Sequence, residues 1–272
     1  MIKGKSIGII SIKGGVGKTT SVVNLAYVLT HDFGKKVAVI DANFSSPNIS
    51  LHLGNINGRH SVHEVLTGKT KLNDALKEHE FGFHVLPGGL GSSISSSNYL
   101  KLKEKVQQLK NHYDVVLLDS SPTLNEELLA TIAASDDLYV ISTPDLPTLS
   151  TTLRAVKLAK EKNMKIKGMI LNKVRGKDFE LKPADMERLS GVPLLGIIQD
   201  NVRVLEALSK VKPITMINPN SSVSLSYKSM AAKMVNASYK EPPWHQKVVG
   251  FLKDDFSKLA THNFSKSLAY YK

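Results

Sequence analysis

Residues 6–20 read Ser6-Ile7-Gly8-Ile9-Ile10-Ser11-Ile12-Lys13-Gly14-Gly15-Val16-Gly17-Lys18-Thr19-Thr20. The apolar run predicts a buried strand, the glycines predict a tight turn, and a helix is expected to begin at Lys18. In such a strand–turn–helix unit, backbone N–H groups of the loop bind phosphate at the N-terminus of the helix. The stretch therefore predicts an α/β protein that binds a nucleotide.

The candidate nucleotide-binding residues are those of the turn and the first helical turn. They are Gly14, Gly15, Val16, Gly17, Lys18, Thr19 and Thr20. The glycines let the main chain approach a pyrophosphate. Lys18 can place its charge between the β- and γ-phosphates, and the Thr19 hydroxyl can ligate Mg²⁺.

The loop departs from the usual phosphate-loop pattern at two positions. Ile12 stands where a glycine is usual, and a second lysine, Lys13, precedes the glycines. The string from Lys13 to Thr20 resembles the deviant Walker A motif of the MinD/ParA family of ATPases, and the chain looks closest to the MinD branch. The resemblance implies that Lys13 reaches the phosphates of a partner subunit, so that ATP and Mg²⁺ lie in a homodimer sandwich. Lys13 and Lys18 are then expected to be catalytic.

Composition limits the possible classes of protein. The chain has 272 residues, 42% of them hydrophobic and 22% charged, which is ordinary for a soluble globular protein. No apolar run reaches about 18 residues, and the N-terminus leads directly into the first strand, so we expect a cytoplasmic protein without a signal peptide. The sequence contains no cysteine, which excludes disulfides, thiolate metal sites and the relatives that assemble iron–sulfur clusters.

Two further apolar runs end in aspartate. Residues 36–41 end at Asp41 and residues 113–119 end at Asp119. Ligands of doubly wound sheets bind at the carboxyl ends of the strands, so both carboxylates are candidates for the site. Asp119 fits the Walker B pattern. We interpret Thr19, Asp41 and Asp119 as magnesium ligands and Asp41 also as a catalytic residue, with helix capping as the alternative for Asp41.

The segments after these two aspartates resemble the two switch segments of the family, at 42–49 and 120–122. Relatives often have a second aspartate that positions the attacking water, and here that position is Asn43. An amide can orient water but cannot accept a proton. Asn43 is therefore a candidate catalytic residue with slow hydrolysis expected, or else a turn residue in a polar loop.

Two residues near strand ends are candidates for the base. The run 166–173 contains Asn172, which resembles the residue that hydrogen-bonds adenine in the family; a turn residue is the alternative. The run 192–200 ends at Asp200, where relatives often have Ile-Pro-x-Asp. Ile198 replaces the proline, so the resemblance supports Asp200 only as a candidate nucleotide-binding residue.

Strands and helices alternate along residues 1–240 without a linker or repeat. This order predicts one doubly wound, mostly parallel sheet with helices on both faces. Glu241-Pro242-Pro243 breaks the pattern, and we expect a separate amphipathic helical tail at 241–272. Its apolar positions recur at helical spacing, and five lysines oppose two aspartates. Residues 244–272 could lie on an anionic membrane, pack on the protein's own core or dock a partner protein.

The formal net charge of +12 favours an anionic partner. Residues 154–182 hold ten Lys or Arg against three acidic residues. This stretch could bind DNA non-specifically, as in ParA relatives, or form a solvated surface. Three hypotheses follow: a MinD-like ATPase that dimerises with ATP and positions cellular assemblies with an activating protein, a ParA-like partition ATPase, or a nucleotide-dependent adaptor with little turnover.

Overall fold

The computed structural model describes residues 4–54, 60–89 and 96–240. The tail expected at 241–272 lies outside these residues, so the proposed division of the chain at residue 240 stays a prediction. None of the helices within the described ranges is long and apolar enough to cross a membrane.

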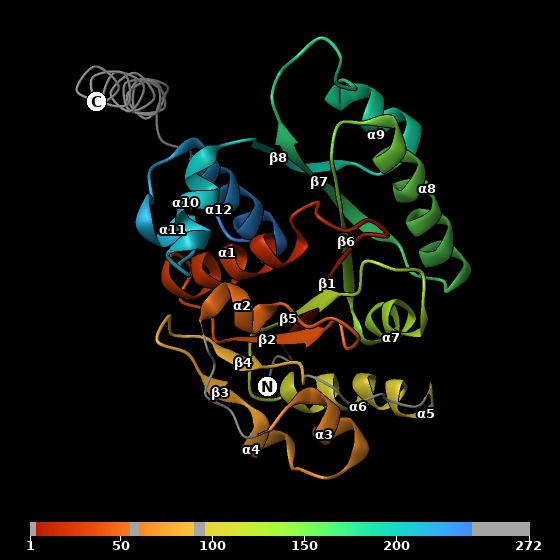
Figure 1. Ribbon diagram of the computed structural model, residues 1–272, viewed down its shortest axis with the longest axis vertical. Coiled ribbons are helices and arrows are strands. Elements are labelled where there is room, and N and C mark those ends of the chain that lie inside the picture. Colours follow the sequence, from red (N-terminus) through yellow and green to blue (C-terminus); the bar gives the residue numbers. More distant parts are fainter. Residues whose placement is uncertain (1–3, 55–59, 90–95, 241–272) are drawn as a thin grey trace, which may run out of the picture.

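The described part of the chain forms one eight-stranded sheet in the order β3-β4-β2-β5-β1-β6-β7-β8 (Figure 1). Its strands are β1 Lys5–Ile10, β2 Val37–Ala42, β3 Lys77–Glu78, β4 His84–Leu86, β5 Val115–Ser120, β6 Asp137–Ser142, β7 Ile166–Val174 and β8 Leu194–Gln199. All neighbouring strands are parallel except β3, which pairs antiparallel with β4. The expected doubly wound, mostly parallel sheet is confirmed.

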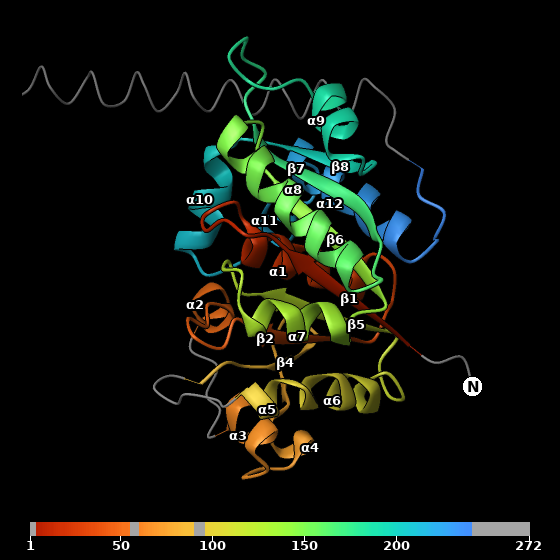
Figure 2. The same ribbon diagram turned by 90° about the vertical axis from the view of Figure 1, so that its right-hand side faces the viewer.

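Helices cover both faces of the sheet. They are α1 Lys18–His31, α2 Ile49–Leu53, α3 Val62–Thr67, α4 Leu72–Ala75, α5 Ser96–Tyr99, α6 Lys101–Leu109, α7 Glu126–Ala134, α8 Leu146–Glu161, α9 Pro183–Ser190, α10 Val202–Ser209, α11 Ile214–Ile217 and α12 Ser222–Met234. Figure 2 shows α6, α7 and α8 in front of the sheet, while α1, α11 and α12 lie behind it. This three-layer arrangement buries the apolar runs of the sheet on both sides.

The central strands explain the continuous apolar runs in the sequence. Every residue of β2, β5 and β6 is buried. In the register of the sheet, Asp41 at the end of β2 lies opposite Asp119 near the end of β5, and Ile9 of β1 lies opposite Asp119 on its other side. The strand order thus brings both carboxyl groups to the edge where the glycine turn follows β1.

Some local features lie beyond what the sequence analysis predicts. The last helix, α12, ends at Met234, because Asn236 turns into the left-handed region with φ 53°. The sequence analysis did not predict α2, α9 or α11, which have five, eight and four residues. Such short helices present too few turns for an apolar periodicity to be recognised.

Candidate nucleotide-binding site

The glycine turn joins β1 to α1 at the carboxyl edge of the sheet. Gly15 and Gly17 have φ values of 74° and 95°, which side chains rarely adopt. A Cβ atom on Gly17 would lie 2.3 Å from Nδ2 of Asn172, whereas one on Gly14 would meet nothing within 4 Å. The turn therefore requires glycine at position 17 both for its backbone and for the close approach of Asn172.

Lys18 begins α1 with its side chain directed back over the turn. Its ammonium donates to the carbonyl of Lys13 at 3.2 Å, and the residue is only 7% exposed. Burial lowers the pKa of Lys18, while the nearby carboxyl of Asp119 opposes the shift. A buried ammonium beside a loop is available to a phosphate that enters the loop.

Thr19 and Asp119 are in direct contact. The Thr19 hydroxyl donates to Oδ2 of Asp119 at 2.6 Å. The other oxygen of Asp119, Oδ1, is buried and has no hydrogen-bond partner. Burial raises the pKa of Asp119 to about 6, against the Thr19 hydrogen bond and Lys18. A buried carboxylate oxygen without a partner beside a hydroxyl fits a hard divalent cation such as Mg²⁺.

Asp41 is buried and caps the chain that follows β2. Its Oδ1 accepts from the N–H of Asn43 at 3.2 Å, and its Oδ2 accepts from the N–H groups of Asn48 and Ile49 at 2.9 and 3.0 Å. Burial and the charge of Asp119 raise the pKa of Asp41 to about 8, although the three N–H groups oppose the shift. Asp41 therefore makes the hydrogen bonds of a capping residue, and it lies opposite Asp119 in the sheet, so its role as a magnesium ligand stays a prediction.

Asn43 is held in the turn that Asp41 caps. Its Nδ2 donates to the carbonyl of Ser46, and its Oδ1 is buried without a hydrogen-bond partner. The side chain thus serves the turn, as the second interpretation expected.

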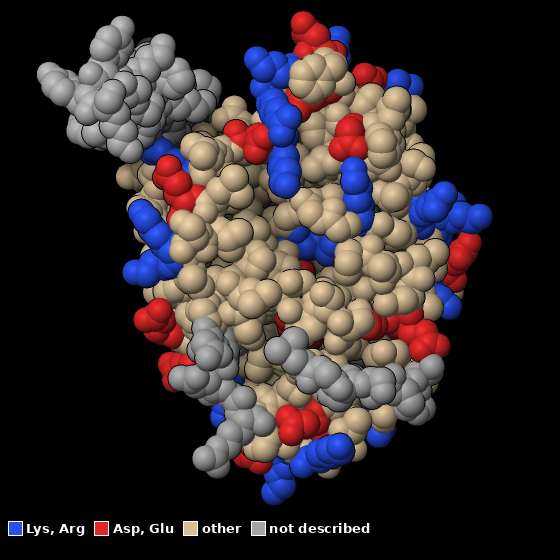
Figure 3. Space-filling model, viewed as in Figure 1, with Lys and Arg blue, Asp and Glu red and all other residues tan. Residues whose placement is uncertain are grey.

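A cavity of about 600 Å³ lies beside the turn and brings most of the predicted residues together. The predicted site residues among its lining are Gly14, Gly15, Gly17, Lys18, Thr19, Thr20, Asn43, Asn172 and Asp200. Lysine and arginine side chains lie beside the hollow at the middle of this face (Figure 3). Four predicted residues do not line this cavity. Lys13 and Val16 border a smaller cavity of about 300 Å³, which also adjoins the turn, while Asp41 and Asp119 are buried and line neither cavity.

The two base candidates are engaged by the protein itself. Asn172 donates from Nδ2 to the carbonyl of Val16 at 2.7 Å. Oδ2 of Asp200 accepts from Nε of Arg175 at 2.7 Å. Both residues line the large cavity, so the structure brings them to the phosphate loop without showing a base contact for either.

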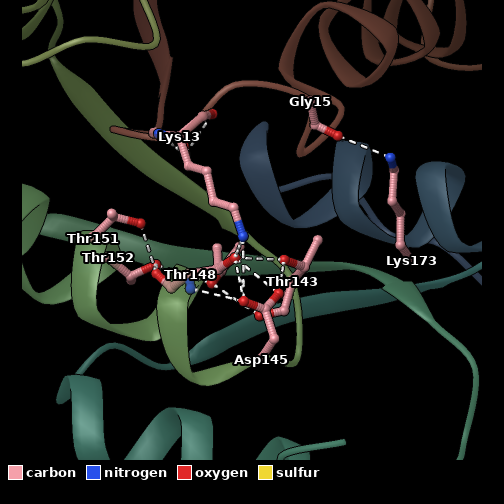
Figure 4. Close-up of polar contacts among 10 residues, drawn as sticks. Lys13, Gly15, Thr143, Asp145, Thr148, Thr151, Thr152 and Lys173 are labelled. Carbon is pink, nitrogen blue, oxygen red and sulfur yellow. Dashed lines mark hydrogen bonds and ion pairs between the residues drawn. The ribbon is translucent and has the colours of Figure 1, made fainter.

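Lys13 points toward α8 of its own chain (Figure 4). Its ammonium donates to the Thr148 hydroxyl and lies 3.2 Å from Oδ1 of Asp145. Burial opposes ionisation of Asp145, but hydrogen bonds from Thr143, Thr148 and Lys13 lower its pKa to about 2. The sequence analysis missed Asp145. The available signal was an aspartate before Leu146-Pro147, since Asp145 caps α8 and accepts from the N–H of Thr148.

The glycine turn follows β1 of a doubly wound sheet, a buried lysine and a threonine line the cavity beside it, and a strand-end aspartate is hydrogen-bonded to that threonine. These features define a phosphate-loop nucleotide-binding protein. Residues 7–214 match the CobQ/CobB/MinD/ParA nucleotide binding domain. The chain belongs to this family of ATPases and lies close to its MinD members.

Individual proteins that are similar to this chain agree with this assignment. An uncharacterized ATP-binding protein of Methanocaldococcus jannaschii is 30% identical over 86% of the chain and 89% of its own length. The septum site-determining protein MinD of Bacillus subtilis is 28% identical over 86% of the chain and 90% of its own length. The structure of MinD from Pyrococcus horikoshii, complexed with Mg-ADP, has a TM-score of 0.77 at 27% identity and covers 85% of this chain and 96% of that one.

Proposed function

We propose that the protein is a switch ATPase that resembles MinD. It binds ATP with Mg²⁺, forms a homodimer, and hydrolyses ATP to ADP and phosphate to control the position of the cell-division site or another cellular assembly. The arrangement of Lys18, Thr19 and Asp119 supports this function: the ammonium of Lys18 and the hydroxyl of Thr19 line one cavity beside the glycine turn, and the carboxylate of Asp119 accepts a hydrogen bond from that hydroxyl.

The chemistry of phosphoryl transfer depends mainly on positioning and charge neutralisation. Lys18 offsets the charge of the terminal phosphates, and Lys13 does so from the second subunit. Thr19 and Asp119 hold Mg²⁺, with Asp41 next to them; bound Mg²⁺ neutralises and orients the phosphate oxygens. The amide oxygen of Asn43, which has no partner in the turn, orients the attacking water. Because an amide cannot accept the proton of that water, turnover is slow without an activating protein.

Asp41 links this cation site to the switch segment at 42–49. Its carboxylate accepts three N–H groups of that segment, so a change beside Asp119 is transmitted to the start of α2. The second segment, at 120–122, follows Asp119 directly. Dimerisation with ATP then alters an outer surface that recognises a partner.

Residues 244–272 are the proposed contact with an anionic membrane, and the protein is proposed to cycle between the cytoplasm and the inner face of the cell membrane. Co-sedimentation tests this. Full-length protein and a chain ending at Tyr239 are incubated with ATP or ADP and with anionic liposomes or plasmid DNA. ATP-dependent pelleting with liposomes that is lost on truncation is expected. Absence of pelleting in every nucleotide state would contradict membrane cycling.

The ParA-like alternative is carried by the exposed lysines of α8 and the following turn. Lys157, Lys160, Lys162 and Lys165 are all exposed. Sedimentation of the protein with DNA that survives truncation and weakens with salt would support this alternative.

The second alternative, an adaptor with little turnover, is suggested by Asn43. Fast steady-state release of phosphate would contradict it.

The homodimer has its own test. Lys13→Ala is expected to abolish ATP-dependent dimerisation while leaving ADP binding in place, because Lys13 does not line the large cavity of its own chain. Light scattering after gel filtration measures the mass. An unchanged dimer of the variant would rule out the two-chain sandwich.

A further inference from the structure

Lys173 follows Asn172 at the end of β7 and contacts the glycine turn. Its ammonium donates to the carbonyl of Gly15 at 2.8 Å (Figure 4), and Asn172 donates to the next carbonyl, that of Val16, at 2.7 Å. Two consecutive side chains of one strand thus hold two consecutive carbonyls of the turn. Neighbouring side chains of a regular strand point to opposite faces, so this arrangement needs a break in the strand.

The break is present at this point. Between Leu171 and Val174, β7 has one residue more than the paired segment of β8 from Ile197 to Gln199, which is a β-bulge. Lys173 itself has φ 57°, in the left-handed region. Bulges beside functional sites redirect side chains, and here the bulge allows Asn172 and Lys173 to reach the same turn.

The conformation of Lys173 has no counterpart elsewhere in the described residues. The other three non-glycine residues with positive φ in those ranges are Asn163, Val211 and Asn236. Each lies two positions after the last residue of a helix, at α8, α10 and α12. That is an ordinary place for a left-handed residue, because it terminates the helix. Lys173 lies within a strand, where a left-handed residue is strained and is retained only where surrounding contacts hold it.

The two carbonyl contacts determine where the turn directs its donors. In a trans peptide the carbonyl and the following N–H point in opposite directions. Holding the carbonyl of Gly15 toward Lys173 therefore turns the N–H of Val16 away from it, and Asn172 does the same for the N–H of Gly17. Within the described residues, the N–H groups of 14–17 make no hydrogen bond to another backbone group. They remain available to an anion.

We propose that Lys173 is a positioning residue of the phosphate loop, which holds the Gly15 carbonyl outward and thereby keeps the loop N–H groups directed at the phosphates of a nucleoside di- or triphosphate. This inference rests on the proposed nucleotide binding and adds a residue that the motif does not contain. Lys173 acts through the backbone of Gly15 and Val16, so its effect belongs to binding more than to turnover.

Replacement by glycine separates this role from a structural one. Glycine adopts a positive φ without strain, so Lys173→Gly removes the ammonium while relieving the backbone. We expect the Kd for mant-ADP with Mg²⁺ to rise about tenfold, as for loss of one charged hydrogen bond, with Tm at or above that of the wild type. Lys173→Arg retains a donor and is expected to restore most of the affinity.

Two control variants complete the test. Asn163→Gly relieves a left-handed residue away from the loop and should leave the Kd unchanged. Lys177→Met removes an exposed charge from the adjacent turn, and its Kd should also stay within about twofold of the wild type, the size expected for screened surface charge.

The outcomes separate the two proposals. Three results would each overturn the role of Lys173. The Kd of Lys173→Gly could be unchanged, its weaker binding could be accompanied by a lowered Tm, or Lys177→Met could lose as much affinity. If wild-type protein binds no mant-ADP or mant-ATP, the proposed function itself fails, and the role of Lys173 fails with it.

Discussion

The Lys13 ammonium lies 3.2 Å from Oδ1 of Asp145 within a single chain. Asp145 is fixed at the N-cap of α8 by the N–H of Thr148 at 2.8 Å, so the acceptor is preorganised. The residue expected to cross to a partner is therefore paired inside its own subunit. In the proposed two-chain sandwich, this pair would have to break before Lys13 could reach a second nucleotide.

Removing the carboxylate should make the dimer easier to form. For Asp145→Asn we expect the ATP concentration at half-maximal dimerisation to fall by up to about fivefold, the effect of one half-exposed ion pair. Analytical ultracentrifugation across an ATP titration measures it. Asp185→Asn, which breaks an exposed ion pair with Arg188 on α9, is the control. Equal dimerisation of Asp145→Asn and wild type would show that the pair does not restrain Lys13.

Gly17 and Gly14 should respond differently to alanine. Gly17→Ala puts a methyl group 2.3 Å from Asn172 Nδ2 at φ 95°, whereas Gly14 has open space. A left-handed alanine alone costs about 1–2 kcal/mol, or a fall in Tm of about 2–8 °C for a domain of this size. We expect Gly17→Ala to melt lower by at least this amount and Gly14→Ala to melt as the wild type does. Differential scanning fluorimetry without nucleotide is sufficient, and equal Tm values for the two variants would contradict the packing argument.

A carboxylate at position 43 should accelerate hydrolysis at the expense of stability. Asn43→Asp supplies a proton acceptor, for which rate gains of about 10²–10⁴ are typical. The variant also loses the donor to the Ser46 carbonyl and adds a carboxylate beside Asp41, so Tm should fall. Asn48→Asp loses a donor to the same carbonyl at an exposed site and is the matched control. If phosphate release is equal in the two variants, residue 43 does not limit the rate.

The buried acidic pair predicts a pH dependence of stability. The pKa values of Asp41 and Asp119 are raised to about 8 and about 6, above the unfolded value of about 3.9. Below the unfolded pKa both carboxyl groups are protonated in both states, and the folded state keeps its full free energy of unfolding. As the pH rises from there through 6 and 8, the unfolded state loses these protons more readily than the folded state does, and the free energy of unfolding falls. The Tm of nucleotide-free protein should therefore fall between about pH 5 and 8.5, and less steeply in Asp119→Asn. Added Mg²⁺ should raise Tm more at the upper end, because the ionised carboxylates bind it.

The sequence predicted the parts of the site that depend on short segments. The turn at 13–20 and the strand-end position of Asp119 are local patterns, and parallel neighbouring strands then place them together. The contacts of Lys13 and Lys173 could not be predicted in this way, since they join residues 132 and 158 positions apart. The bulge in β7 arises from pairing with β8, so Lys173 gave no local signal of its conformation.

The two edges of the sheet limit how copies of this protein can meet. On one side β3 is two residues long and carries Lys77 and Glu78; on the other, the Lys233 ammonium donates to the carbonyl of Leu195 in β8 at 2.9 Å. Short, charged or occupied edges resist the addition of a further strand from another molecule. Open-ended polymerisation through the sheet, and the aggregation that accompanies it, is thereby disfavoured. At high concentration and without nucleotide, the protein is therefore expected to resist association through its strands.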